Sequence, residues 1–72
     1  MRFEDILADL EAQGYTIVAI LPNEDPYKRQ VIVKDTNGNQ MIKNYVLAGF
    51  VDIKDDSNNV IGVDEDWVEV QS

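Results

Sequence analysis

The fold is decided by the stretch from residue 3 to residue 15, which reads FEDILADLEAQGY. Its large apolar side chains recur at intervals of three and four residues, the spacing that places them on one stripe of an α-helix. The stripe consists of Phe3, Ile6, Leu7 and Leu10. The acids fall largely off this stripe, and Glu4 and Asp5 suit the positive end of a helix dipole. We therefore predict a helix over residues 3–13.

The end of this helix is marked by Gly14. Glycine readily adopts the left-handed conformation that closes many helices, and the residue after it often packs back on the last turn. We expect Tyr15 to pack on Leu10 in this way, as in a Schellman cap.

Beyond the helix the sequence predicts only strands. Residues 15–21 form a nearly continuous apolar run, which is typical of a buried strand. Residues 27–35 and 40–47 are predicted to form a hairpin, because Asn37 and Gly38 supply the positive φ angles of a tight turn. Residues 50–54, 60–63 and 67–70 complete the series, with a bend or bulge at Ala48-Gly49 and a polar turn at 55–59. Residues 41–50 also fit a helical stripe; we favour a strand because the hairpin turn leads directly into it.

These elements predict a single α+β domain over residues 1–72. One N-terminal helix packs on a twisted antiparallel sheet of five or six strands. The sheet side of the core is expected to come from Ile17, Ala19, Val31, Val33 and either Val51 or Ile53. A chain of this length buries only about 60% of its unfolded surface, so the core is small.

The charge is strongly acidic, with 14 acids, six bases and a formal charge of −8. Residues 35–72 hold eight of the acids and only two of the bases. Such a surface repels nucleic acid and anionic membranes and attracts basic protein surfaces. The N-terminus is acidic where a signal peptide is basic, and no apolar run reaches the roughly 20 residues that span a bilayer. We expect a cytoplasmic protein, in the host cytoplasm if a phage encodes it.

Enzymatic chemistry is disfavoured because the chain has no histidine and no cysteine. Without these, nothing activates its serine and threonine hydroxyls, which belong to Thr16, Thr36, Ser57 and Ser72. The acid pairs Asp55/Asp56 and Asp64/Asp66 could serve hydrolysis only in a pocket that raises one pKa, and so small a domain has little room for one. We predict no catalytic residue and no cofactor.

Residues 55–66 partly match the pattern of a calcium-binding loop. Oxygen-bearing residues occupy positions 1, 3, 5 and 12 of an EF-hand register, namely Asp55, Ser57, Asn59 and Asp66. However, Val60 stands at position 6, where the loop needs a glycine. A solvated turn without metal is the favoured interpretation.

The acidic second half is the candidate partner surface. Its residues are Asp52, Asp55, Asp56, Asp64, Glu65, Asp66, Trp67 and Glu69. The acids would steer a basic partner, and an exposed tryptophan would fill a pocket in it. Trp67 has a second interpretation, in which it closes one end of the core.

The first half resembles that of small acidic phage-encoded anti-CRISPR proteins, which occupy the DNA-binding cleft of an RNA-guided nuclease as DNA mimics. The similar features are Met1, Asp5, Ile6-Leu7, Leu10, Tyr15-Thr16, the strand around Ile32, and Gly38-Asn39, within roughly residues 1–43. The resemblance implies a small phage-type inhibitor. This chain departs from the family where acids engage the target, because it has the neutral residues Gly14, Asn37 and Gln40, and it continues with predicted strands instead of helices.

Two functions follow from these observations. The first is a non-enzymatic binding protein whose acidic face engages a basic, nucleic-acid-binding protein as a nucleic-acid mimic, such as a CRISPR nuclease. The alternative is a small assembly module of a phage or mobile element that forms homo-oligomers through an exposed sheet edge.

Overall fold

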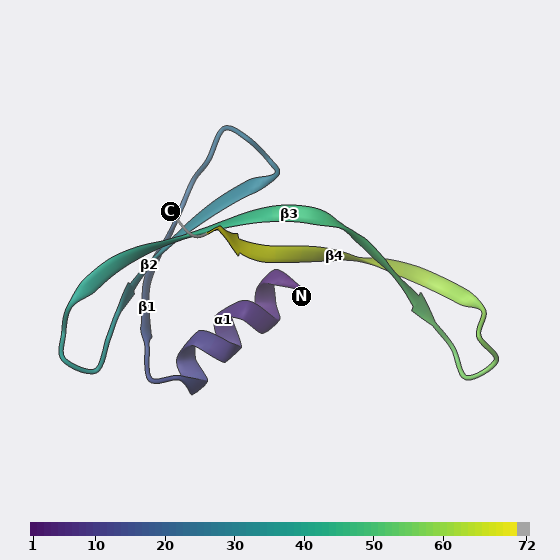
Figure 1. Cartoon of the computed structure of the whole chain (residues 1–72), viewed down its shortest axis with the longest axis horizontal. Coiled ribbons are helices and arrows are strands. Elements are labelled where there is room, and N and C mark those ends of the chain that lie inside the picture. Colours follow the sequence, from purple (N-terminus) through teal and green to yellow (C-terminus); the bar gives the residue numbers. More distant parts are fainter. Residues whose placement is uncertain (71–72) are drawn as a thin grey trace.

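The structure is a computed structural model that describes residues 1–70, and it shows one helix followed by an antiparallel meander of four strands (Figure 1). The elements are α1 (Phe3–Ala12), β1 (Thr16–Leu21), β2 (Lys28–Lys34), β3 (Gln40–Lys54) and β4 (Val60–Val70). The strands pair in chain order, β1-β2-β3-β4. The predicted α+β class is confirmed, and the predicted number of five or six strands is wrong.

The number differs because two pairs of predicted strands are continuous. β3 runs from residue 40 to residue 54, and its ladder with β4 is only shifted, not broken, between Leu47 and Gly49. The Ala48-Gly49 feature is therefore a bulge, as the sequence allowed. Strand β4 likewise runs through residues 64–66, which pair with Val51, Phe50 and Gly49. Residues 41–50 are strand, as we favoured.

The cap of α1 is the predicted Schellman motif. Gly14 has a φ of 99°, and its N–H donates to the carbonyl of Glu11 at 3.0 Å. The N–H of Tyr15 donates to the carbonyl of Leu10, also at 3.0 Å. These two bonds satisfy carbonyls that the last helical turn leaves without partners, and they turn the chain directly into β1.

The two long hairpins use the same kind of turn. Between β2 and β3, Gly38 donates its N–H to the carbonyl of Asp35, and Asp35 donates its own to the carbonyl of Asn39. Only Gly38 has a positive φ, 85°, whereas Asn37 does not. This is a type I turn followed by a left-handed residue, a three-residue loop, and not the two-residue turn in which both central residues have positive φ.

The core lies between α1 and the concave face of the sheet. Its buried residues are Phe3, Ile6, Leu10, Val31, Val33, Tyr45 and Trp67. Leu7 of the predicted stripe is only partly buried, and Ile17 packs at the margin. Val51 and Ile53, which we expected in the core, are exposed, and Ala19 pairs with Ile32 on the opposite face of the sheet.

The exposure of Val51 and Ile53 has a simple geometric cause. A 10-residue helix is about 15 Å long, whereas a 15-residue strand spans roughly 50 Å. The molecule extends 47 Å along its longest axis, and α1 lies between β1 and the C-terminal part of β4 (Figure 1). The far end of the β3–β4 hairpin therefore has no helix to cover it.

Candidate functional site

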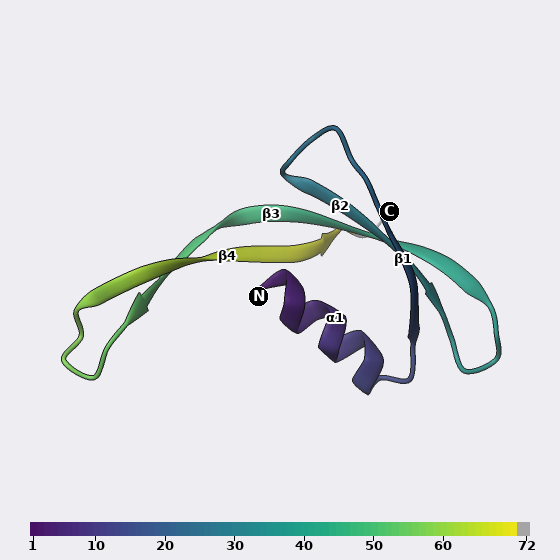
Figure 2. The ribbon, with the colours of Figure 1, turned by 180° about the vertical axis from the view of Figure 1, so that it is seen from behind.

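The uncovered end of the β3–β4 hairpin, residues 49–65, is the most distinctive surface of the molecule, and we call it the arm. It projects beyond α1 in both views of the ribbon (Figures 1 and 2). Strand β2 pairs with β3 only as far as Val46, so within the described residues the arm is a two-stranded ribbon with no third strand on either edge. Such a ribbon has marginal stability on its own.

Large apolar side chains are exposed along the whole arm. They belong to Phe50, Val51, Ile53, Val60, Ile61 and Val63, and Phe50 and Ile61 are each 66% exposed. Single exposed apolar residues are common on protein surfaces, but here three lie on each face of the ribbon: Phe50, Ile61 and Val63 on one, and Val51, Ile53 and Val60 on the other.

The strand register divides the arm into two faces. Phe50 pairs with Glu65 and Asp52 pairs with Val63, so these four side chains share one face. Because strand residues alternate, this face continues the one on which Trp67 lies. At its base, Glu65 shares a hollow with Phe3 and Glu4 of α1, and farther out no helix of the described residues lies above it. Each acid on this face therefore sits beside an exposed apolar side chain.

Five of the predicted partner-surface acids lie on the arm: Asp52, Asp55, Asp56, Asp64 and Glu65. The only base among residues 49–65 is Lys54. The structure thus brings most of the predicted acids together and combines them with the apolar side chains just described. Asp52, Asp56 and Glu65 are exposed.

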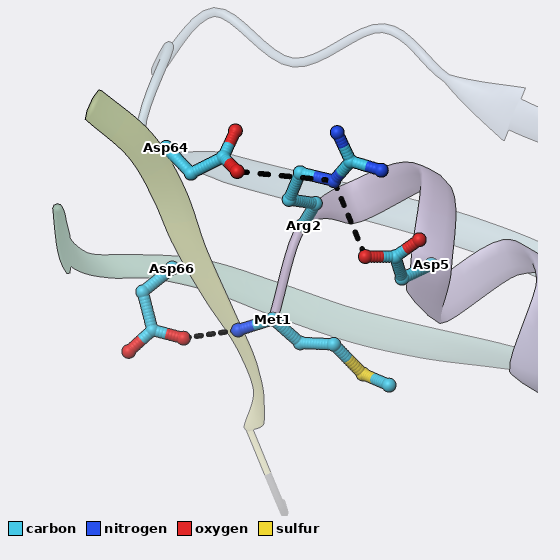
Figure 3. Close-up of polar contacts among 5 residues, drawn as sticks. All are labelled: Met1, Arg2, Asp5, Asp64 and Asp66. Carbon is cyan, nitrogen blue, oxygen red and sulfur yellow. Dashed lines mark hydrogen bonds and ion pairs between the residues drawn. The ribbon is translucent and has the colours of Figure 1, made fainter. Parts of the chain in front are cut away.

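Two acids at the base of the arm contact the N-terminal segment (Figure 3). The amino group of Met1 forms an ion pair with Asp66, and the carbonyl of Met1 accepts a hydrogen bond from the N–H of Trp67 at 2.7 Å. Arg2 donates to Asp5 at 3.2 Å and lies 4.0 Å from Asp64. The hydrogen bond to Asp5 and the nearby charges raise the pKa of Arg2. Asp66, and to a lesser degree Asp64, therefore hold the N-terminal segment.

The Asp55 carboxylate shapes the turn at the tip of the arm. Its Oδ1 accepts hydrogen bonds from the N–H groups of Ser57 and Asn59, both at 2.9 Å. Asp66, the twelfth residue of the proposed calcium register, instead pairs with Met1. Within residues 1–70, no group of three or more acids is placed to hold a metal ion. This segment is a turn, as the sequence predicts, and Asp55 stabilises it.

Trp67 lies in the core and not on the surface. It is 1% exposed, its ring lies 5.7 Å from that of Phe3, and the guanidinium of Arg29 stacks over it at 4.4 Å. The structure confirms the second interpretation from sequence, in which Trp67 belongs to the core. Its side chain is therefore not exposed to a partner. Glu69 faces the same side and pairs with Lys43 at 3.6 Å.

A hollow beside α1 is smaller than a typical ligand pocket. It has a volume of about 180 Å³, and its lining includes Asp9, Lys43, Tyr45 and Glu69. Typical ligand pockets occupy roughly 300–1,000 Å³. Burial, with smaller effects of Glu69 and Asp9, raises the pKa of Tyr45 to about 12, so its hydroxyl stays protonated near neutral pH. The hydroxyls of Thr16, Thr36 and Ser57 are in exposed positions, and Ser72 lies outside the described residues.

The apolar residues of the arm are the part of the site that sequence reasoning missed. Their alternation with polar residues is the pattern of any strand with one buried face. A signal was present nevertheless, because a single short helix cannot cover all the strands that the sequence predicts.

The comparisons with known proteins add no identity: no family model, curated protein or solved structure matches this chain. In the part of the chain that the structure describes, no helix has the length and apolarity to cross a membrane.

Proposed function

We propose that this chain is a cytoplasmic, non-enzymatic binding protein that acts through its arm on a basic and apolar protein surface. The observation that carries the proposal is the interleaving of acids and exposed apolar side chains on residues 49–65, where only Asp64 and Glu65 at the base lie close to the N-terminal segment and α1. The apolar groups supply burial and the acids supply orientation and steering.

The combination favours a protein partner. Burying apolar side chains such as Phe50 needs an apolar counterpart, which a phosphate backbone does not offer, and the acids repel nucleic acid. Where the partner's surface is itself a nucleic-acid site, the arm would act as the mimic that the resemblance to anti-CRISPR inhibitors implies.

The arm acids are suited to steering because they stand in solvent. Asp52, Asp56 and Glu65 make no side-chain hydrogen bond or ion pair with other described residues. Asp55 and Asp66, in contrast, hold a turn and the N-terminal segment. Substitution of the first three therefore tests binding without disturbing the fold.

The test compares capture of proteins from a bacterial lysate by three versions of the chain. The first is native, and the second carries Asp52→Asn, Asp56→Asn and Glu65→Gln. The third is a control with the same charge change away from the arm, Asp9→Asn, Glu11→Gln and Glu24→Gln. We expect the arm variant to lose most of the captured basic protein and the control to keep it. Equal capture by the arm variant at low salt would contradict the proposal.

A second experiment addresses the mimic. DNA or RNA is added to the complex of the native chain with its captured protein. Displacement of the chain indicates that the arm covers a nucleic-acid site, and an undisturbed complex indicates another basic surface. A variant with polar residues in place of two apolar ones, Phe50→Ser and Val63→Thr, should bind the captured protein more weakly, both with and without added nucleic acid.

A further inference from the structure

The face of the sheet opposite α1 is also uncovered. Register places on it alternate residues of each strand, which include Ile32, Ile42, Val46, Val68 and Val70. Ile42 is 55% exposed, and Val68 and Val70 are exposed as well. We call this the outer face, and no helix within residues 1–70 covers it (Figure 2).

The part of the outer face that β1, β2 and β3 form has a charge opposite to that of the arm. Lys28 and Lys34 occupy outer positions of β2, two residues from Gln30 and Ile32 respectively, and both are exposed. No acid stands at an outer position of β1, β2 or β3 as far as Val46. Asp64 and Asp66 stand at outer positions of β4, where Arg2 and the amino group of Met1 accompany them. The molecule therefore carries a basic, apolar patch around β2 and an acidic, apolar arm.

Charged residues flank apolar side chains on both surfaces. Lys28 and Lys34 lie six residues apart on one strand, which is roughly 20 Å, with Ile32 between them and Ile42 paired with Ile32. On the arm, Glu65 stands opposite Phe50 at the base, and Asp56 lies in the turn beyond Lys54, the last residue of β3. Val63 lies between these two acids.

We propose that the arm of one copy docks on the outer face of a second copy of this chain. The inference rests on the proposed function, and it names the basic, apolar partner surface. It differs from association through a sheet edge, because side chains on a sheet face make the contact. Pairing of two arms with each other is disfavoured because it would oppose their acids.

The balance of forces sets the conditions of the test. Two copies of charge −8 repel one another, and salt screens this repulsion over about 8–10 Å. Salt therefore weakens both the general repulsion and the local attraction. Charge reversal distinguishes the general repulsion from the local attraction, because it changes the sign of chosen charges on the arm or on the outer face.

The experiment uses two double variants of the full chain. The arm variant carries Asp56→Lys and Glu65→Lys, and the face variant carries Lys28→Glu and Lys34→Glu. All four positions are exposed, so the fold should persist, which circular dichroism and thermal melting confirm for each variant. Sedimentation velocity then measures the association of native chain, each variant and an equimolar mixture of the two.

We expect the native chain to associate with increasing concentration and each variant alone to remain monomeric. The mixture should associate again, because lysines on one arm meet glutamates on the other copy's face, while the native acids of the second arm meet native lysines. A native chain that stays monomeric, variants that associate like the native chain, or a mixture no more associated than its components would each overturn the inference.

Failure of this inference is distinguishable from failure of the proposed function. If the native chain is monomeric but the arm acids are needed to capture a basic protein from the lysate, the second-copy inference falls and the binding function stands. If the arm acids are needed for neither association nor capture, both are wrong.

Discussion

Asp35 and Asp55 perform the same task in two different hairpins. Asp35 Oδ1 accepts hydrogen bonds from the N–H groups of Asn37 and Asn39, and Asp55 Oδ1 accepts them from Ser57 and Asn59, all at 2.9 Å. Each turn also has a left-handed residue at its fourth position, Gly38 in one and Asn58 in the other. In each hairpin the carboxylate fixes the conformation of the loop. The turn at the tip of the arm therefore has the same hydrogen-bonding pattern as the turn between β2 and β3.

The first prediction concerns acid stability. Hydrogen bonds from the backbone of Asn39 lower the pKa of Asp35, with a smaller contribution from Asn37. A depressed folded-state pKa stabilises the protein above the ordinary pKa of 3.8, and this contribution is lost as pH falls through the folded-state value. Asparagine in Asp35→Asn keeps a side-chain oxygen that accepts hydrogen bonds but does not titrate. The variant should therefore lose less stability than the native chain as the pH falls. Thermal melts between neutral pH and pH values below 3.8 measure it, with Asp56→Asn as the control. An unchanged pH profile would refute the role of Asp35.

The second prediction concerns the fourth residue of the turn. A Cβ atom at Gly38 would meet no atom within 4 Å, so the cost of an alanine there comes from the φ of 85°. Gly38→Ala should lower the free energy of unfolding by about 1–2 kcal/mol. Gly38→Asn should cost less, because Asn58 already holds this conformation. Thr36→Ser should have little effect. Urea melts give these values, and equal stability of the alanine and asparagine variants would show that φ is not the cause.

The third prediction separates members of the helix stripe. Leu10 is 5% exposed, whereas Leu7 is only partly buried beside the core. Leu10→Ala should cost roughly 2–5 kcal/mol, and Leu7→Ala should cost less, because fewer contacts are lost. Ala8→Ser, on the exposed side of α1, serves as the control. A ranking in which Leu7→Ala is the more damaging would contradict the placement of α1.

The fourth prediction concerns Trp67, the only tryptophan of the chain. Because it is 1% exposed, its fluorescence maximum should lie at a short wavelength in the folded protein and shift to longer wavelengths on unfolding. Trp67→Ala should cost about 3–5 kcal/mol. Phe50→Ala, which removes an aromatic residue that is 66% exposed, should cost far less. A native maximum typical of a solvated indole would contradict the core position.

Local signals account for what the sequence could predict. The helix, its Schellman cap and the position of the first hairpin turn depend on residues within a few positions of one another, such as Leu10, Gly14 and Tyr15. The bulge at Ala48 was also anticipated. These features require no knowledge of distant contacts.

The rest depends on the relation between elements. The three acids at residues 64–66 predict a gap between two strands. In the structure they are exposed or half-buried and pair with β3, so their charges remain hydrated within a continuous strand. The exposure of Val51 and Ile53 follows from the length of β3 compared with α1. The sequence predicts the length of the helix closely, but it divides β3 into strands 40–47 and 50–54. The sequence alone does not show which face of the sheet Lys28 and Lys34 occupy. The strand register places both on the face of β2 opposite the core.

The most direct test of the account is a contact between the arm and the outer face of another molecule. Isotope-filtered nuclear Overhauser measurements on an equal mixture of labelled and unlabelled chain detect only contacts between copies. The account predicts signals from the Phe50 ring to the methyl groups of Ile32 and Ile42. Signals between the arms of two copies, or none at concentrations where the chain associates, would contradict it.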